Sequence, residues 1–305
     1  MRWVVQAALW LAVLAVVTAG VASLCGTWLW PGDMMTPFRP QLLLLAIGVA
    51  LLCAFGRGPY LGATAFMAVI LCLAPIMGRV ADQKVLPERA ETPARHVGIV
   101  FSNVLCDNQA YSRVTDLVRA QDPDLFIAAE TTPEWIAHLD SLRDRYPYRF
   151  APPGLKIFGI AAYAKKPFVS QVMRIGAHRM PLGRLEFADQ VVFVAHPLPP
   201  HSASTAADNR AYIATLTRLA RAETKPVIVA GDLNATLWSG AMTPVLAAGL
   251  QWPQGSGDVY TWPVAKPWLA IQIDQVLARG AIAGTYRRLP EVGSDHYPVR
   301  VDLQF

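Results

Sequence analysis

The first part of the chain consists of long apolar runs. Three stretches contain no charged residue, from Trp3 to Gly32, from Pro40 to Gly56 and from Gly58 to Gly78. A helix needs about 20 apolar residues to cross a bilayer core of about 30 Å, because each residue advances it by about 1.5 Å. The pattern therefore predicts a membrane region over residues 1–78, with about three transmembrane helices at residues 4–28, 40–56 and 59–77.

The second run is the shortest and begins at a proline. The link that follows it, Phe55 to Pro59, has two glycines and a proline around Arg57, which predicts a tight turn. The first run could instead be a cleaved signal peptide, since Arg2 precedes it and it contains small residues. It continues too far for that, and Trp28 and Trp30 suit an interfacial anchor better. A buried hairpin of a soluble domain is less favoured, because buried helices seldom run so long without a charge.

The orientation of these helices is weakly encoded. Arg2 and Arg57 fall on one side of the membrane, and Arg39 and Arg79 fall on the other. If Arg2 keeps the N-terminus in the cytoplasm, three spans place residues 79 onward outside it. Residues 79–96 are polar, contain two prolines and show no periodicity, so we expect a linker there.

After the linker, short apolar runs each end in a polar residue, a pattern typical of strands. The predicted strands are residues 97–102 before Asn103, 124–129 before Glu130, 190–195 before His196, 226–231 before Asp232, 270–278 around Asp274, and 299–303 after Asp295 and His296. Helical patterns lie between several of them, at residues 110–120, 133–145 and 209–222. Strands separated by helices predict a layered α/β domain over residues 97–305, with its polar groups at one edge of the sheets.

A single carboxylate after a buried strand is more often a helix cap or the partner of a surface cation than a catalytic group. The histidines elsewhere are interpreted in the same structural way: His96, His138, His178 and His201. The ordered set changes this interpretation, since nearly every member stands at a strand end. The candidate site residues are Asn103, Glu130, His196, Asp232, Asn234, Asp274, Asp295 and His296.

Composition narrows the function only a little. The chain is 53% hydrophobic and 16% charged, and the apolar excess lies in residues 1–78, whose only charges are Arg2, Asp33, Arg39 and Arg57. The chain has 27 Lys and Arg residues and 22 Asp and Glu residues, and all but those four follow residue 78. The net charge of that part is about +3, which neither indicates nor excludes binding of nucleic acid. Cys106 is the single cysteine after residue 78, so a disulfide framework or Cys-rich zinc site is excluded there.

Five segments resemble motifs of the endonuclease/exonuclease/phosphatase superfamily, which includes deoxyribonuclease I, AP endonucleases, neutral sphingomyelinases and inositol polyphosphate 5-phosphatases. They are Pro123 to Glu130, Val194 to Pro197, Gly231 to Asn234, Ile273 to Leu277 and Ser294 to Pro298, and they stand in the order of the family. The resemblance implies a four-layered α/β sandwich of two β-sheets flanked by helices. It also implies one divalent cation, usually Mg²⁺, with Mn²⁺ as a substitute.

The chain looks most like bacterial members of that superfamily with N-terminal membrane spans. This resemblance implies an integral protein of the bacterial inner membrane. With the orientation that Arg2 favours, we expect its catalytic domain on the periplasmic or extracellular side.

The resemblance also implies roles for the site residues. Hydrolysis of a phosphoester needs neutralised phosphoryl charge, an aligned water and help for the leaving oxygen. Glu130 is expected to bind Mg²⁺, and Asn103 and Asp295 to complete or orient its shell. His296 is expected to contact the scissile phosphate or act as the base, with Asp274 fixing its tautomer.

The remaining roles concern the water and the phosphate. Asp232 is expected to orient or deprotonate the attacking water, and Asn234 to bind a phosphate oxygen without adding charge. His196 would be a second phosphate ligand or a general acid.

The sequence departs from the family pattern at two places, next to Asn103 and in the expected partner of His196. AP endonucleases have Asn-x-Asp after the first strand, where this chain has Leu105 in the third position. Deoxyribonucleases pair their first histidine with a central glutamate, whereas residues 159–167 here contain no carboxylate, which weakens an acid role for His196. Tyr163 in that stretch could bind phosphate or pack in the core.

These observations predict a membrane-anchored, metal-dependent phosphodiesterase, phosphatase or nuclease acting on a phospholipid, a nucleic acid or another phosphodiester. Residues 197–208 and 252–268 are candidate substrate loops, and the aromatic residues of the second could stack on bases, touch lipid or pack the loop down. A non-catalytic binding protein with the same fold is the alternative. A purely structural membrane protein would explain the spans but not the ordered motifs.

Overall fold

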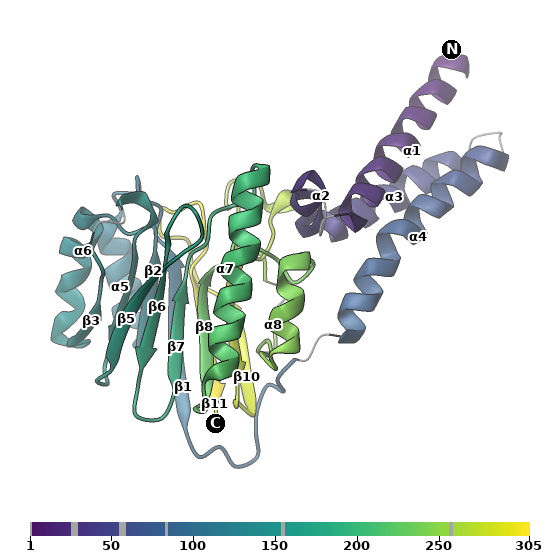
Figure 1. Ribbon diagram of the computed structural model, residues 1–305. Coiled ribbons are helices and arrows are strands. Elements are labelled where there is room, and N and C mark those ends of the chain that lie inside the picture. The colour runs from purple at the N-terminus through teal and green to yellow at the C-terminus, as the bar shows by residue number, and fades with distance from the viewer. Residues whose placement is uncertain (1, 26–29, 55–58, 83–84, 154–155, 256–258) are drawn as a thin grey trace.

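The apolar runs at the start of the chain form helices that project from the rest of the molecule in a computed structural model of the protein (Figure 1). The structure describes residues 2–25, 30–54, 59–82, 85–153, 156–255 and 259–305. The long helices are α1 (Arg2–Leu24), α3 (Arg39–Ala54) and α4 (Pro59–Asp82), and two short helical segments, α2 (Trp30–Met35) and η1 (Thr36–Phe38), precede α3. The expected turn at residues 55–58 and the anchor Trp28 lie outside the described residues.

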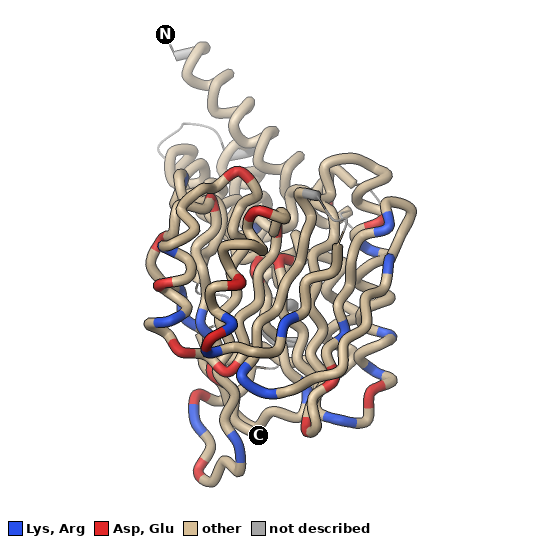
Figure 2. The backbone as a smooth tube through the Cα atoms, turned by 90° about the vertical axis from the view of Figure 1, so that its left-hand side faces the viewer, with Lys and Arg blue, Asp and Glu red and all other residues tan. Residues whose placement is uncertain are grey.

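Three segments are long and apolar enough to cross a membrane: Trp3–Leu24, Trp30–Ala54 and Leu61–Gly78. Large apolar side chains face outward along them, including Trp3, Leu44 and Phe66, which are 85%, 70% and 64% exposed. Smaller residues such as Ala46 and Ala65 pack the helices against one another. Figure 2 shows the projecting N-terminal helix, which has no charged residue after Arg2, whereas charged residues are scattered over the strand-rich part of the chain. Such outward apolar surface suits contact with lipid rather than water.

Two mixed β-sheets form the centre of the second part of the chain. The six-stranded sheet has the order β10-β11-β1-β2-β4-β3, and the five-stranded sheet has the order β5-β6-β7-β8-β9. The strands of the first sheet are β1 (His96–Asn103), β2 (Leu125–Ala129), β3 (Tyr148–Phe150), β4 (Ile160–Ala164), β10 (Ala283–Arg288) and β11 (Val299–Gln304). Those of the second are β5 (Val169–Ile175), β6 (Met180–Glu186), β7 (Val191–Ala195), β8 (Val227–Asp232) and β9 (Asp274–Arg279).

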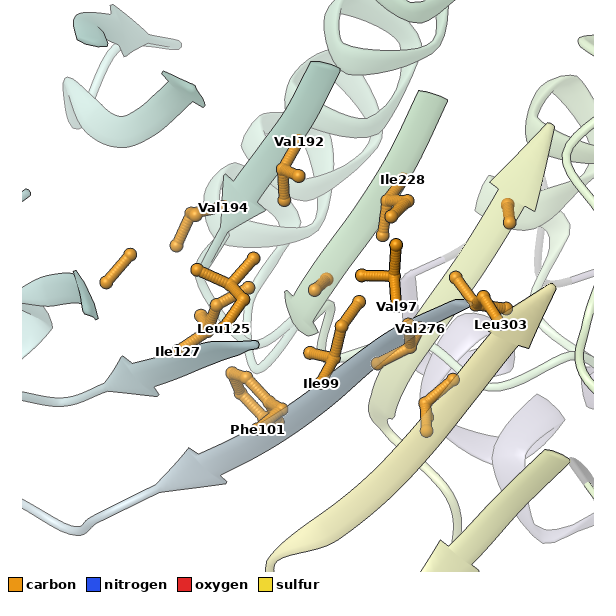
Figure 3. Packing of buried hydrophobic residues seen from close by; sticks show 14 of the residues in the cluster. Val97, Ile99, Phe101, Leu125, Ile127, Val192, Val194, Ile228, Val276 and Leu303 are labelled. Atoms are coloured by element: carbon orange, nitrogen blue, oxygen red, sulfur yellow. The ribbon is translucent and has the colours of Figure 1, made fainter. Parts of the chain in front are cut away.

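The two sheets pack face to face because their strands alternate side chains toward a shared core. Ile99, Phe101 and Ile127 of the first sheet meet Val192 and Ile228 of the second (Figure 3). The outer faces are covered by helices: α5 (Tyr111–Gln121), α6 (Pro133–Leu139) and η2 (Asp140–Asp144) on the first sheet, α7 (Ala203–Ala222), η4 (Gly240–Met242) and α8 (Thr243–Ala247) on the second. The order of layers is therefore helix, sheet, sheet, helix, the four-layered sandwich expected from the sequence.

Two predicted elements differ from the observed ones. Residues 270–273 are not part of a strand, since Ile271 pairs only with Trp262 in an isolated bridge and β9 begins at Asp274. The helix expected over residues 133–145 ends at Leu139 and continues as the 3₁₀ segment η2. Two other 3₁₀ segments, η3 (Lys156–Phe158) and η5 (Pro267–Leu269), lie in loops.

The pairing of the strands decides where the polar residues gather. β1 runs parallel to β2, and β7 runs parallel to β8, so the carboxyl ends of all four strands lie at one edge of the sandwich. Asn103, Ala129, Ala195 and Asp232 are the last residues of these strands. This edge lies on the same side of the domain as α2, beside the upper end of α7 (Figure 1).

Candidate active site

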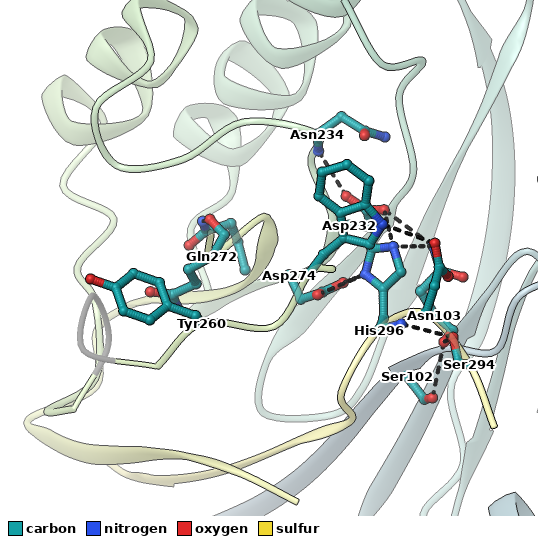
Figure 4. A network of polar contacts seen from close by, with 12 residues as sticks. Ser102, Asn103, Asp232, Asn234, Tyr260, Gln272, Asp274, Ser294 and His296 are labelled. Atoms are coloured by element: carbon teal, nitrogen blue, oxygen red, sulfur yellow. Dashed lines mark hydrogen bonds and ion pairs between the residues drawn. The ribbon is translucent and has the colours of Figure 1, made fainter. Parts of the chain in front are cut away.

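Asn103 links the two sheets at this edge. Its amide nitrogen donates to Oε1 of Glu130 at 2.9 Å and to Oδ2 of Asp232 at 3.1 Å, and its Oδ1 accepts from the backbone N–H of Leu105 at 3.1 Å. Ser294 donates to the Asn103 carbonyl oxygen at 2.8 Å (Figure 4). Asn103 therefore orients the two carboxylates, and Leu105, the departure from the Asn-x-Asp pattern, contributes its backbone rather than its side chain.

Glu130 follows β2 in a left-handed backbone conformation, with φ of 59°. Asn234, after β8, is also left-handed, with φ of 48°. Residues other than glycine rarely adopt this conformation, and such strain concentrates at functional sites. Both turns direct a polar side chain toward the pocket at the sheet edge, because Glu130 and Asn234 both line it.

The glycine before Asp232 is required by close packing. A Cβ on Gly231 would lie 1.8 Å from the carbonyl oxygen of Ala195. Any residue other than glycine at this position would therefore prevent the observed close approach of β7 and β8. Gly231 thereby allows the His196 and Asp232 ends of the two parallel strands to lie side by side.

His296 and Asp274 form a buried pair. Nδ1 of His296 lies 2.9 Å from Oδ2 and 3.1 Å from Oδ1 of Asp274, and both side chains are at most 5% exposed. Burial by itself lowers the pKa of His296, but the nearby Asp274 carboxylate outweighs it and raises that pKa to about 9. The opposite ring nitrogen, Nε2, lies 3.8 Å from Oδ2 of Asp232 (Figure 4). The imidazole is thus held protonated at neutral pH.

Asp232 is the third member of this cluster. Burial and the Asp274 charge raise its pKa to about 6, against the lowering effect of His296. The backbone N–H of Asn234 donates to its Oδ1 at 2.8 Å. The raised pKa makes Asp232 more basic than an ordinary aspartate, as a group that accepts a proton from water should be.

His196 makes no hydrogen bond to a carboxylate and only borders two of them, Glu130 at 3.9 Å and Asp232 at 4.0 Å. Its Nδ1 lies 3.4 Å from the backbone oxygen of Asp232, and its Nε2 is buried without a hydrogen-bond partner among the described residues. Glu130 is 3.9 Å away from Nε2. An unpaired buried nitrogen that faces the pocket suits contact with a bound anion or water.

Asn234 and Asp295 complete the set. Asn234 donates to the carbonyl oxygen of Pro197 at 3.0 Å, which leaves its second amide hydrogen for another acceptor. Oδ2 of Asp295 accepts from Nε1 of Trp262 at 2.9 Å, and its Oδ1 is buried with no partner in the part of the chain that the structure describes. An unshared buried carboxylate oxygen suits a cation or a donor.

The candidate residues surround one pocket of about 290 Å³. Of the expected set, Glu130, His196, Asp232, Asn234, Asp295 and His296 line it, while Asn103 and Asp274 lie behind them and hold them. Tyr163, for which a phosphate contact remained open, is fully buried in the core and donates to Asp140 at 3.0 Å.

Two sets of residues at the pocket are candidates for holding a divalent cation. Ligand atoms of Asp232, Asp274 and His296 lie within 4.8 Å of one another, but both Asp274 oxygens already bind His296. Glu130 and Asp295 fit better, because both line the pocket and Asp295 has an unshared oxygen. Mg²⁺ takes one or two carboxylates and keeps several waters, which this pair satisfies.

The sequence did not reveal several residues at this site. Trp262 was noted only as a loop aromatic, yet it lines the pocket and binds Asp295. His201 was interpreted as structural, but it lies at the pocket as well. Met34, Pro37 and Phe38, from the segment before α3, form another part of the lining. Their apolar character was indistinguishable from that of the membrane runs around them.

The family model of the Endonuclease/Exonuclease/phosphatase family matches residues 100–296. No curated protein sequence matches the chain.

Several solved structures share the fold. Sphingomyelinase C from Streptomyces griseocarneus is similar with a TM-score of 0.55 and 16% identity, over 70% of this chain and 100% of that one. Truncated TDP2 from Caenorhabditis elegans gives 0.54 and 15%, over 71% and 100%. A mutant beta toxin from Staphylococcus aureus with bound magnesium ions gives 0.54 and 14%, over 68% and 99%.

Proposed function

The chain belongs to the endonuclease/exonuclease/phosphatase family, and from this premise we propose that it is a membrane-anchored, Mg²⁺-dependent phosphoester hydrolase. The observation that carries the proposal is the buried His296–Asp274 pair, whose other ring nitrogen, Nε2, lies 3.8 Å from Asp232 and 3.4 Å from the amide nitrogen of Asn103. Beside this pair, Glu130 and Asp295 offer carboxylate oxygens of the kind that Mg²⁺ prefers.

In this proposal Glu130 and Asp295 would hold a divalent cation, which would supply positive charge to neutralise the phosphoryl oxygens and the leaving oxygen. Asn103 keeps Glu130 in place through its 2.9 Å hydrogen bond. The family resemblance left two roles open for His296, phosphate contact or base. The raised pKa of His296 favours contact, because an imidazolium donates hydrogen bonds but accepts no proton.

Asp232 then remains as the group that orients and deprotonates the attacking water. Its carboxylate is fixed by Asn103 and by the backbone of Asn234, at 3.1 and 2.8 Å. The second amide hydrogen of Asn234 is available for a phosphate oxygen. Nδ1 of His196 faces the carbonyl oxygen of Asp232 and can only donate to it, so Nε2 of His196 donates to a phosphate oxygen when the ring is protonated. These donors would stabilise charge that develops in the transition state.

The test is hydrolysis of bis-p-nitrophenyl phosphate by the purified full chain in detergent. We expect turnover with Mg²⁺ and with Mn²⁺, complete loss in EDTA, and recovery when Mg²⁺ is returned. Failure to hydrolyse the diester with Mg²⁺, Mn²⁺ or Ca²⁺ would favour the non-catalytic binding protein instead.

We also propose that residues 85–305 lie on the periplasmic or extracellular side. Three spans are an odd number, so the N-terminus and the catalytic domain face opposite sides of the membrane. Arg2 favours a cytoplasmic N-terminus. Alkaline phosphatase fused after Phe305 should therefore be active, and green fluorescent protein at the same position should be dark. The reverse pattern would place the domain in the cytoplasm.

A further inference from the structure

One wall of the catalytic pocket comes from the membrane region. Met34, at the end of α2, and Pro37 and Phe38, in η1, line the same pocket as Asp232 and His296. These residues follow the first apolar helix and immediately precede α3, which begins at Arg39. The pocket therefore lies where the helix bundle meets the catalytic domain.

Polar contacts hold this wall against the domain. Gly32 and Asp33 are buried, and the carboxylate of Asp33 is only 5% exposed. The contacts are Asp33 with Arg210 of α7 at 3.1 Å, Thr36 with Ser239 at 3.4 Å, Arg39 to the Trp238 carbonyl at 3.0 Å, and Gln41 to the Ala270 carbonyl at 3.0 Å. A buried charge paired in this way fixes the position of α2, because breaking the pair would leave a charge unpaired.

The remainder of the pocket is largely apolar beyond its catalytic edge. Phe158, Ile271 and Ile273 contribute to the lining, together with prolines at 199 and 200. Among the described residues that line the pocket there is no Lys or Arg. Proteins that hold nucleic acids meet the phosphate backbone mainly with those two residue types. The lining thus fits an apolar group attached to the phosphoester better than a polynucleotide.

Exposed apolar residues continue from the pocket toward the bundle. Trp268 is 72% exposed and Leu269 is 40% exposed, and they stand next to Ala270, whose carbonyl binds Gln41 in the first turn of α3. Tryptophan at the end of a membrane helix bundle is typical of the interface, where its ring lies among lipid headgroups. The exposed residues Trp268 and Leu269 thus lie between the first turn of α3, which Gln41 joins to Ala270, and the pocket residue Ile271.

We propose that the substrate is a membrane amphiphile with a phosphoester headgroup. Its phosphate lies at His296 and Asp232, and its apolar chain lies against Met34, Pro37 and Phe38. A lipid could then enter along the bundle without leaving the bilayer. This inference rests on the proposed function and names the substrate class of the same site.

The test compares two chromogenic diesters, p-nitrophenyl methyl phosphate and p-nitrophenyl dodecyl phosphate. They share the scissile bond and leaving group and differ in chain length. We expect kcat/KM of the full chain to be at least about tenfold higher for the dodecyl ester, because burial of even two methylene groups strengthens binding by about that factor. Met34→Ala and Phe38→Ala should each reduce this ratio several-fold.

Met35→Ala is the matched control, since Met35 is half-buried in the same helix but does not line the pocket. Met35→Ala should keep the wild-type ratio of the two kcat/KM values. Because the dodecyl ester partitions into detergent equally in assays of every variant, a lower ratio in Met34→Ala than in Met35→Ala reports a change in the pocket. A wild-type ratio near unity, or an equal fall in Met34→Ala and Met35→Ala, would overturn the inference while hydrolysis itself stands. An unchanged ratio in both Met34→Ala and Phe38→Ala would do the same.

The inference and the proposed function can fail separately. Absence of turnover for both esters and for bis-p-nitrophenyl phosphate would reject the hydrolase itself. If an alanine variant fails to fold, Phe38→Leu provides a milder change, and the wild-type ratio alone still decides whether chain length matters.

Discussion

Asp274 holds the imidazole of His296 with both of its carboxylate oxygens, at 2.9 and 3.1 Å from Nδ1. Because an ionised carboxylate only accepts hydrogen bonds, Nδ1 must carry a proton. This geometry turns Nε2 toward Asp232, 3.8 Å away, and toward the pocket. The pair therefore sets both the orientation and the charge of the ring.

Replacing Asp274 by Asn should damage catalysis more than binding. The amide keeps the volume of the carboxylate but removes its charge, so His296 loses the partner that favours imidazolium. We expect kcat to fall by about 100-fold or more, with a smaller change in KM. Steady-state kinetics with bis-p-nitrophenyl phosphate measures both.

Asp302→Asn is the control for this change. Asp302 also contacts a histidine, His96, at 3.4 Å, but on β11 away from the pocket. It should retain near wild-type kinetics. Similar losses of kcat in the two variants would show that the loss in Asp274→Asn does not depend on the position of Asp274 beside His296.

The same pair should make metal-free stability depend on pH. The pKa of His296 is raised to about 9 in the folded protein, above its ordinary value of about 6.5. The stabilisation from the bound proton is thus fully present below about pH 6.5 and is lost as the pH rises through about 9. Thermal unfolding in EDTA, followed by tryptophan fluorescence, should show the Tm advantage of wild type over Asp274→Asn narrowing across that window. If the Tm difference between wild type and Asp274→Asn stayed constant or widened as the pH rises, Asp274 would not be the group that raises the pKa of His296.

Glu130→Gln should weaken divalent cation binding. A neutral amide oxygen is a poorer ligand for a hard cation than a carboxylate oxygen, so we expect the Kd for Mn²⁺ to rise about tenfold or more. Electron paramagnetic resonance of free Mn²⁺ gives this value without any need for turnover. Glu134→Gln, in the first turn of α6, is the control and should bind Mn²⁺ as wild type does.

The contact between the membrane region and the domain can be tested by cross-linking. The hydroxyl oxygens of Thr36 and Ser239 lie 3.4 Å apart although the residues are 203 positions apart in sequence. Cysteines at both positions should form a disulfide on mild oxidation, because their side chains face each other at close range. A mobility shift on a non-reducing gel reports it, and Thr36→Cys alone is the control. Equal shifts in the single and double variants would mean that the wall is not docked as described.

Much of the fold was accessible from local patterns. Runs such as residues 97–101 and 226–231 contain no polar side chain because their strands are buried on both faces, and each ends near the sheet edge. Parallel pairing, which the alternation of strands and helices already favoured, aligns β1 with β2 and β7 with β8. The packing of one sheet on the other then brings Asn103 and Asp232 together.

Other parts depended on contacts that no local pattern encodes. Residues 270–273 are as apolar as a strand, yet Ile271 lines the pocket and forms only one bridge. The roles of Met34 and Phe38 arise because a segment between two apolar helices folds back onto loops more than a hundred residues away. Trp262 likewise gains its role from Asp295, which follows it by 33 positions.

The most direct measurement of the central claim is the rate of bis-p-nitrophenyl phosphate hydrolysis by His296→Ala at saturating Mg²⁺. His138→Ala is the companion, since His138 stacks on Tyr111 away from the pocket. If His296 contacts the phosphate as proposed, its variant should lose at least about 1000-fold in kcat/KM, in line with removal of a principal charge-stabilising donor, while His138→Ala remains within a few-fold of wild type. Equal activity of the two variants would contradict the account.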